Sequence, residues 1–393
     1  MQYRNFGKSS LKVSALSMGC MRLPRMQDAN GVTVVDREKA YEMIRYAADN
    51  GINHFDTAYG YHSKTSEEVL GEALEGGRRE KVRIATKQPY RTMIDFNSGG
   101  GKDIYDNMRR NLESQLKKLR TSYLDFYLIH GIGPDNWEGV KKDKVIDEYE
   151  KFKSEGLIKG IAFSFHGNFA CFKDVIEFYD WDMCQVQQNF MDINRECTEE
   201  GLRIAGKKGI AIVVMEPLRG GSLGTPPDHI KAIYDEYPEK RSGVEWAFRH
   251  VINYPEVSSA LSGMSTLEQV KENIEIFSKP DMVANCLSPK EKELIVRVKA
   301  AYESVKGVPC TACDYCMPCP QGVAIPRIFG RYNDGKMFGN FEPAKRGYMF
   351  ITNGKSDASL CNNCGECVTK CPQDFDIPKE LKMVHETLGG WKE

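Results

Sequence analysis

The feature that most constrains the fold is a regular alternation of short β-rich runs and longer helical patterns between residues 13 and 280. Within residues 37–51, for example, apolar side chains recur at the spacing of one helix face. Eight of the β-rich runs have the length and composition expected of buried strands. The expected strands are 13–18, 52–58, 82–87, 123–130, 158–164, 183–187, 210–215 and 257–262.

Eight strand–helix alternations predict an α/β protein built on a closed (β/α)8 barrel of the TIM type, which takes roughly 250 residues. A doubly wound open sheet is the main alternative for such a pattern. In that fold the first strand usually leads into a G-x-G-x-x-G loop, whereas the first strand here leads into MGCMR at 18–22. We therefore expect a barrel at residues 1–285.

A second region is expected beyond the barrel, because 393 residues exceed what one barrel needs. A charged helical pattern at 289–306 ends at a Gly-Val-Pro break, after which cysteine, glycine and proline become frequent. Apolar residues of this helix lie along one side: Ile295, Val298, Tyr302 and Val305. We expect a linker helix at 286–309 and a second domain at 310–393.

Eight of the thirteen cysteines form two short runs in this second region. The second run, CNNCGECVTKCP, has the C-x2-C-x2-C-x3-C-P spacing of bacterial ferredoxins, in which closely spaced thiolates bind [4Fe–4S] clusters. The first run, CTACDYCMPCP, departs from it only in its shorter last gap. The runs comprise Cys310, Cys313, Cys316 and Cys319, and then Cys361, Cys364, Cys367 and Cys371.

Two such runs predict two clusters, and in two-cluster ferredoxins the fourth ligand of each comes from the other run. Cys371 then completes the first cluster and Cys319 the second. Two structural zinc sites are the alternative, because C-x2-C pairs also suit tetrahedral zinc. The segments 325–335 and 345–354 look helical, so we expect an α-helical ferredoxin-like module.

Four polar residues lie at or just beyond the expected carboxyl ends of consecutive strands, where TIM barrels form their active sites. Asp56 and Tyr61 follow the second strand, Lys87 ends the third, and His130 ends the fourth. Each residue alone has an ordinary explanation, such as a turn cap or a solvated cation. All four at successive strand ends predict a catalytic site.

These positions resemble the aldo/keto reductase family, whose motifs are D-T-A-x-x-Y, a lysine ending the third strand and a histidine ending the fourth. The opening segment YRNFGKSSLKVSAL and the segment SEEVLGEAL are similar to that family as well. The resemblance covers residues 1–285. It implies hydride transfer between a nicotinamide cofactor, NADP or NAD, and a small carbonyl compound or alcohol.

The resemblance also implies a role for each of the four residues. Tyr61 is the general acid in reduction and the base in oxidation, and the Lys87 ammonium stabilises its phenolate. Asp56 holds Lys87 in place. His130 orients the carbonyl oxygen of the substrate.

Residues at the nicotinamide are implied by the same resemblance. Ser164 stands where the family has a Ser-Asn pair, but Phe165 replaces the asparagine, and His166 is either its substitute or a polar side chain without that role. Gln185 matches the amide-binding glutamine. Met215 occupies the place of a tyrosine that stacks on the nicotinamide.

The remaining dinucleotide residues are implied after the seventh and eighth strands. Gly263 and Gln269 stand where the family carries the Lys and Arg of its 2′-phosphate segment, so the choice between NADP and NAD stays open. Residues implied at the adenosine are Ser265, Gln269 and Asn273. A glycine-rich loop is expected to offer backbone N–H groups to the pyrophosphate: Leu218, Arg219, Gly220 and Gly221.

Composition excludes some partners. The formal net charge is −1, so no basic excess favours nucleic acid or an anionic membrane. No stretch approaches the ~20 apolar residues of a membrane span, and the first residues lack the pattern of a signal peptide. We expect a soluble, cytoplasmic protein with neither a nucleic-acid nor a membrane partner.

The leading hypothesis is a carbonyl reductase or alcohol dehydrogenase whose clusters exchange electrons with a ferredoxin-like or flavoprotein partner. A nicotinamide transfers two electrons and a cluster one, so such coupling normally needs a flavin, for which the sequence has no motif. One alternative is an ordinary reductase with structural clusters. Another is a catalytically silent electron-transfer or docking protein, against which the complete set of four catalytic residues argues.

Overall fold

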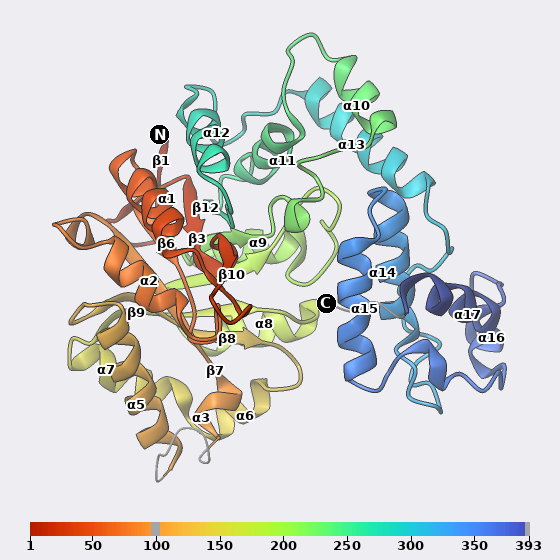
Figure 1. The fold of residues 1–393 in the computed structure, drawn as a ribbon, viewed down its shortest axis with the longest axis horizontal. Coiled ribbons are helices and arrows are strands. Elements are labelled where there is room, and N and C mark those ends of the chain that lie inside the picture. The colour runs from red at the N-terminus through yellow and green to blue at the C-terminus, as the bar shows by residue number, and fades with distance from the viewer. Residues whose placement is uncertain (96–102, 390–393) are drawn as a thin grey trace. The chain divides into compact units, whose positions relative to one another are not determined.

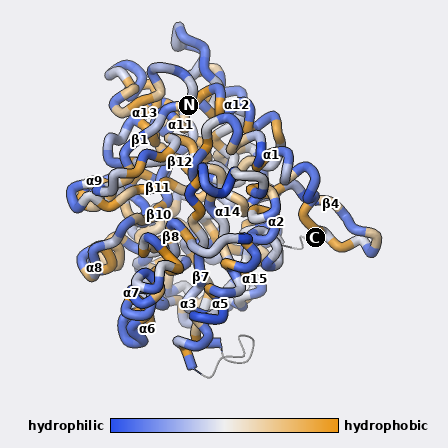
Figure 2. Tube along the Cα trace, turned by 90° about the vertical axis from the view of Figure 1, so that its left-hand side faces the viewer, coloured by the Kyte–Doolittle hydropathy of each residue, from blue (hydrophilic) through white to orange (hydrophobic). Residues whose placement is uncertain are grey.

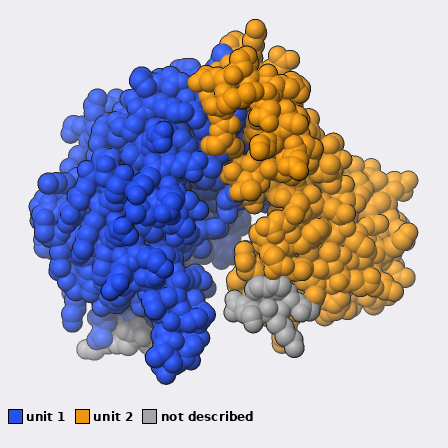
Figure 3. Space-filling model, turned by 45° about the horizontal axis from the view of Figure 1, so that its top comes forward, with its two compact units in different colours: residues 1–221, 244–288 blue, residues 222–243, 289–393 orange. Residues whose placement is uncertain are grey.

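The computed structural model describes residues 1–95 and 103–389. They form two compact units, which Figure 3 shows in different colours. Unit 1 comprises residues 1–221 and 244–288, and unit 2 comprises residues 222–243 and 289–393.

Unit 1 is built around a closed barrel of eight parallel strands (Figure 1). In order around the barrel, the strands are β10, β11, β12, β3, β6, β7, β8 and β9. Each of the eight predicted strands overlaps one of them, which confirms the (β/α)8 barrel. Their bounds are β3 (Leu16–Gly19), β6 (His54–Asp56), β7 (Arg83–Pro89), β8 (Leu124–Ile132), β9 (Ile158–Phe165), β10 (Met183–Gln187), β11 (Ala211–Met215) and β12 (Val257–Ser262).

The first predicted strand is divided in two, which corrects the expectation for residues 13–18. β2 (Lys12–Ser14) pairs antiparallel with β1 (Tyr3–Asn5), and only β3 enters the barrel. The chain turns between them because the hairpin buries Phe6 and Val13 among the side chains of the barrel interior. The rings of Phe6 and Phe126 lie 4.8 Å apart there.

Helices surround the strands, and Figure 2 shows apolar strands inside a layer of more hydrophilic helices. Helix α1 (Arg37–Asp49) begins at Asp36, whose side chain accepts from the Lys39 backbone N–H, and it buries its apolar face as predicted. The other helices of unit 1 are α2 (Ser66–Ala73), α3 (Tyr90–Met93), α5 (Ile104–Lys118), α6 (Trp137–Lys142), α7 (Val145–Ser154), α8 (Phe169–Phe178), α9 (Thr198–Lys207), α11 (Gly243–Ile252) and α12 (Leu267–Ser278). A short hairpin, β4 (Arg25–Gln27) with β5 (Thr33–Val35), and the 3-10 turns η1 (Cys20–Arg22), η2 (Arg79–Lys81) and η3 (Arg219–Gly221) complete the unit.

The described part of unit 2 contains helices and no strand, which confirms the expected helical module. Its helices are α10 (Asp228–Asp235), α13 (Pro289–Ser304), α14 (Ile325–Met337), α15 (Glu342–Asn353), α16 (Glu366–Lys370) and α17 (Ile377–Leu388), with the 3-10 turn η4 (Ala358–Leu360). Helix α13 buries Ile295, Val298 and Tyr302, whereas Val305 lies beyond the helix end and is exposed. Helix α10 packs against α13 although it precedes β12 in the chain, an association for which the sequence carries no signal.

None of the helices that the structure describes combines the length and the apolarity needed to cross a bilayer.

Candidate active site and cysteine module

Three neighbouring strands bring the predicted catalytic residues to one end of the barrel. Asp56 ends β6, Lys87 lies near the end of β7, and His130 lies near the end of β8. Tyr61 follows β6 in a turn where its backbone N–H donates to the Ala58 carbonyl over 3.1 Å. Because these strands are parallel and adjacent, their carboxyl ends meet at one mouth.

Lys87 is fully buried, and its ammonium group connects Asp56 with Tyr61. Its Nζ donates to Asp56 Oδ1 at 2.5 Å, to the Thr57 carbonyl at 2.8 Å and to the Tyr61 hydroxyl at 3.4 Å. These contacts use all three donors of the ammonium. Burial opposes the charge, but the Asp56 carboxylate and the Tyr61 oxygen outweigh it and raise the pKa of Lys87.

Tyr61 is held as a neutral phenol. Burial raises the pKa of its hydroxyl, and the Asp56 carboxylate adds to the rise. Lys87 favours the phenolate and lowers this pKa, but its effect is smaller than that of burial. At neutral pH the hydroxyl therefore carries its proton, which is the state required of a proton donor.

His130 faces Tyr61 edge-on, with the ring centroids 5.8 Å apart. Burial lowers the pKa of His130 to about 3, and the positive charges of Lys87, His166 and Arg91 act in the same direction. Its Nδ1 is buried and has no hydrogen-bond partner among the residues that the structure describes. A neutral imidazole at this mouth can donate one hydrogen bond to a substrate oxygen.

Two residues predicted at the nicotinamide have partners within the protein. Gln185 Nε2 donates to Asp56 Oδ2 at 2.9 Å, so the carboxylate is held on one oxygen by Lys87 and on the other by Gln185. The Ser164 hydroxyl accepts from the Gly131 backbone N–H at 2.8 Å. Both side chains lie at the barrel interior and are buried.

Two acidic residues after β10 contact predicted residues of the mouth. His166 Nδ1 lies 3.3 Å from Glu196 Oε1, and this hydrogen bond raises the pKa of His166. Arg219 Nε donates to Asp192 at 2.8 Å and lowers the pKa of that carboxyl against the effect of burial. The sequence prediction missed both acids because the segment after β10 carries no motif. Met215, at the end of β11, is half-buried.

The glycine-rich loop after β11 is open on one side. Gly220 has φ +68° and Gly221 has φ +98°, a region that favours glycine. A Cβ added to Gly221 would meet no atom within 4 Å. The Gly221 N–H donates to the Leu218 carbonyl at 2.9 Å, which closes the turn.

The residues predicted at the adenosine make hydrogen bonds at the start of α12. The Gln269 side chain accepts from the Ser265 backbone N–H at 2.8 Å, and the Thr266 hydroxyl caps the helix by accepting from the Gln269 N–H. Asn273 is buried and donates to the Ser262 hydroxyl at 3.2 Å. The Thr-x-x-Gln spacing is a capping signal that the sequence already contained.

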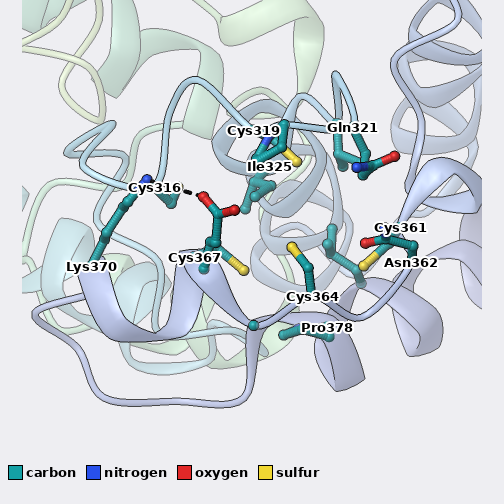
Figure 4. Close-up of a pocket in the computed structure, with 15 residues that line it drawn as sticks. Cys316, Cys319, Gln321, Ile325, Cys361, Asn362, Cys364, Cys367, Lys370 and Pro378 are labelled. Carbon is teal, nitrogen blue, oxygen red and sulfur yellow. Dashed lines mark ion pairs between the residues drawn. The ribbon is translucent and has the colours of Figure 1, made fainter.

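The eight clustered cysteines are free thiols that surround two hollows in unit 2. The first hollow is lined by Cys310, Cys313, Cys316 and Cys371. The second is lined by Cys319, Cys361, Cys364 and Cys367, which Figure 4 shows around it, and also by Cys316. Each hollow thus takes thiols from both runs, as in the predicted ligand sets.

The thiols that line the hollows are not gathered around the position of one ion. Within the described ranges, no three His, Cys, Asp or Glu side chains lie close enough to hold a single metal. Burial raises the pKa of Cys316 to about 11 and that of Cys367 above its usual value, so these thiols need a bound cation to ionise at neutral pH. The Ala312 N–H points at Cys310 Sγ over 3.4 Å, a contact that stabilises a thiolate.

Comparison with known proteins finds a matching family model for the barrel and another for the cysteine module. Residues 15–286 match the model of the aldo/keto reductase family, and residues 309–375 match the model of a 4Fe-4S dicluster domain. An uncharacterized oxidoreductase, YqkF, of Bacillus subtilis is 25% identical over 302 residues, which are 70% of this chain and 90% of that protein. The NADH-specific methylglyoxal reductase of Escherichia coli is 26% identical over 230 residues, 55% of this chain and 67% of that protein.

A solved structure shows the same architecture. The holo form of the aldo-keto reductase AKR11C1 from Bacillus halodurans superposes with a TM-score of 0.61 at 25% identity, covering 76% of this chain and 96% of that one. The family model spans more than half of the present sequence and includes all eight barrel strands. The chain is therefore a member of the aldo/keto reductase family that carries a C-terminal 4Fe-4S dicluster domain.

Proposed function

We propose that this oxidoreductase interconverts a small carbonyl compound and its alcohol, using a nicotinamide dinucleotide, with Tyr61 as the proton-transfer residue. One observation carries the proposal. The buried Lys87 ammonium bonds to Asp56 at 2.5 Å and reaches the Tyr61 hydroxyl at 3.4 Å. A cation in this position stabilises the phenolate that remains after Tyr61 gives up its proton.

The chain's residues manage the proton and the substrate oxygen. When bound, a reduced nicotinamide would supply the hydride for the carbonyl carbon. The neutral His130 donates a hydrogen bond to the carbonyl oxygen and directs it toward the Tyr61 hydroxyl. Tyr61 then protonates that oxygen, and Lys87 holds the resulting phenolate until it is reprotonated from solvent. In the oxidation direction the phenolate accepts the alcohol proton.

The choice of dinucleotide is proposed from the residues at the start of α12. Gly263 and Gln269 offer no cation to a 2′-phosphate, and Gln269 is already engaged with Ser265. A related reductase is named as NADH-specific. We therefore propose binding of both dinucleotides without a strong preference for NADP.

We propose that the two hollows of unit 2 each hold one [4Fe–4S] cluster, ligated by the thiols that line them. The match to a dicluster domain and the grouping of thiols from both runs support this assignment. The barrel at 1–285 would then carry hydride chemistry and the module at 310–393 one-electron chemistry, joined by a linker at 286–309. A flavoprotein or ferredoxin-like partner would connect the two. Free cysteines suit a cytoplasmic setting.

The decisive variant is Tyr61→Phe, which removes only the phenolic hydroxyl. Loss of the proton donor is expected to lower kcat for carbonyl reduction about 100-fold or more, with dinucleotide binding retained. Tyr59→Phe is the matched control, because the Tyr59 ring contacts Lys64 and Lys118, and the substitution leaves the backbone of Tyr59 unchanged. Full activity of the Tyr61 variant in a folded protein would refute the proposed mechanism.

A further inference from the structure

The two hollows of the cysteine module differ in the charge of the side chains around them. Apart from the cysteines, Asp314 is the one ionisable side chain among the described residues that line the first hollow. The second hollow is lined by Glu366 and Lys370, which form an ion pair with 3.6 Å between Oε2 and Nζ (Figure 4). The first hollow therefore has a negative rim, whereas the charges at the second hollow balance.

The loop that carries Asp314 lies at the surface of unit 2. Residues 311–315 are all exposed, and they include the thiol of Cys313. Ala312 and Asp314 have φ values of +56° and +64°, in the left-handed region that winds a loop tightly. The cysteines of this loop line the hollow, while the residues between them are exposed to solvent. A group bound in the first hollow would thus lie directly beneath this loop.

Tyr315 gives the loop an apolar centre. Its large side chain is 67% exposed, although aromatic rings are usually buried in a core or in an interface. Asp374 lies at the same rim, because Gln373 and Phe375 on either side of it line the first hollow. Asp314 and Asp374 are both exposed, and neither forms an ion pair within the part of the chain that the structure describes.

The negative excess persists in the residues that adjoin this rim in the sequence. Arg327 follows the lining residue Pro326 and is exposed, and it contributes a positive charge. Asp374 and Asp376 flank the lining residue Phe375 and contribute two negative charges. An exposed ring bordered by an excess of carboxylates is the arrangement of a small docking surface with an apolar centre and a charged rim.

We infer that a small electron-transfer protein with a basic docking surface binds over Tyr315 at the first hollow, an inference that rests on the proposed [4Fe–4S] clusters. One electron would pass between the cluster of the first hollow and a one-electron centre of the partner, so that one is oxidised as the other is reduced, without any bond being made or broken. Electron-transfer complexes are transient and have small interfaces. Opposite charges at the rim raise the rate of encounter, which is what such a complex requires.

The test uses ferric cytochrome c, a small basic electron carrier, as the probe. Its dissociation constant is measured by isothermal titration calorimetry at low ionic strength on the full-length, cluster-loaded protein in the oxidised state. No electron moves between two oxidised proteins, so the constant reports docking alone. Tyr315→Ser is expected to raise the constant by about 5- to 30-fold. Asp314→Asn combined with Asp374→Asn is expected to raise it by about 3- to 10-fold, an effect that added salt should abolish.

Two further variants serve as matched controls. Tyr315→Phe keeps the aromatic ring and is expected to bind within about twofold of the parent. Glu386→Gln removes an exposed carboxylate of α17 that lines neither hollow, and it should also stay within about twofold. Iron analysis of each variant shows whether the clusters are retained. The rate at which the reduced protein reduces ferric cytochrome c should fall in the same order of variants.

Several results would overturn the inference. Unchanged binding by iron-loaded Tyr315→Ser would remove the docking role of the ring, and a larger loss from Glu366→Gln than from Asp314→Asn would place the docking at the second hollow. Tighter binding of an acidic ferredoxin than of cytochrome c would contradict the basic partner. Self-association of the parent that Tyr315→Ser abolishes would make a second copy of this chain the occupant.

Failure of the inference is distinguishable from failure of the proposed clusters. Iron-loaded parent protein that does not bind cytochrome c would refute the docking surface alone. Parent protein purified without oxygen and found free of iron and sulfide would refute the clusters, and the inference with them.

Discussion

In the barrel mouth the three donors of Lys87 meet oxygens of Asp56, Thr57 and Tyr61, whereas in unit 2 eight free thiols surround two hollows. The first arrangement is complete within the protein, because a buried ammonium requires partners wherever it is placed. The second is complete only with a bound group, because thiols bind a metal as thiolates and burial raises the pKa of three of these thiols, Cys310, Cys316 and Cys367. The mouth is thus preorganised by the fold, and the cysteine module depends on what it binds.

The largest effect should follow from removing the cation of the mouth. Lys87→Met leaves the buried Asp56 carboxylate without its ion pair, which is expected to lower the free energy of unfolding by about 3–5 kcal/mol. It also removes the charge that stabilises the phenolate, so reduction should slow by about 100-fold or more. Chemical denaturation and steady-state kinetics measure the two effects.

A second substitution separates those effects. Lys87→Met combined with Asp56→Asn removes both charges, so most of the stability should return while activity stays low. If the double variant is as unstable as the single one, the ion pair does not account for the loss. If Lys87→Met alone unfolds at the denaturant concentration of the parent, the mouth is not preorganised in the way described.

Substitution of one cysteine of the module should lower its metal content. Cys364→Ser removes one thiol of the second hollow, and we expect the iron content after anaerobic purification to fall by about half, from about eight atoms per chain. Cys171→Ser, a half-buried cysteine outside the module, is the control and should keep the full iron content. Iron and acid-labile sulfide analysis measures this result.

The same variant distinguishes two roles for the clusters. Unchanged turnover with the iron halved would favour structural clusters beside an ordinary reductase. Loss of turnover with dinucleotide binding intact would favour electron transfer. An unchanged iron content would contradict the assignment of Cys364 as a ligand.

A smaller effect is expected from acid. His54 is fully buried inside the barrel, and its Nδ1 forms a 2.8 Å hydrogen bond with the Ser17 hydroxyl. Burial lowers the pKa of His54 to about 3. The unfolded chain protonates this imidazole below its ordinary pKa of about 6.5, so stability is present above that pH and is lost as pH falls toward 3. Between pH 7 and pH 5 the loss should be about 2 kcal/mol.

The matched measurement is the free energy of unfolding of the parent and of His54→Gln at both pH values. Glutamine keeps polar groups at the position but does not titrate, so the variant should lose less stability on acidification. Equal losses in the two proteins would show that His54 does not contribute to the acid sensitivity of the barrel.

The sequence predicts the barrel and the cysteine runs well because both signals are local. Strand length, helical spacing and C-x2-C gaps each involve residues a few positions apart. It also places Asp56, Lys87 and His130 at the mouth, since residues at the ends of parallel strands share one edge. The division of the first strand was missed because it depends on burial of Phe6 beneath a barrel closed by distant segments.

What the amino-acid sequence determined by itself is therefore the set of elements and the residue types at their ends. Which of those residues touch was decided by the tertiary structure. Gln185 reaches Asp56 from 129 positions away, and Arg22 reaches Gly220 from 198. Such pairs form because barrel closure makes strand ends neighbours, and no periodicity along the chain encodes which side chain crosses to which.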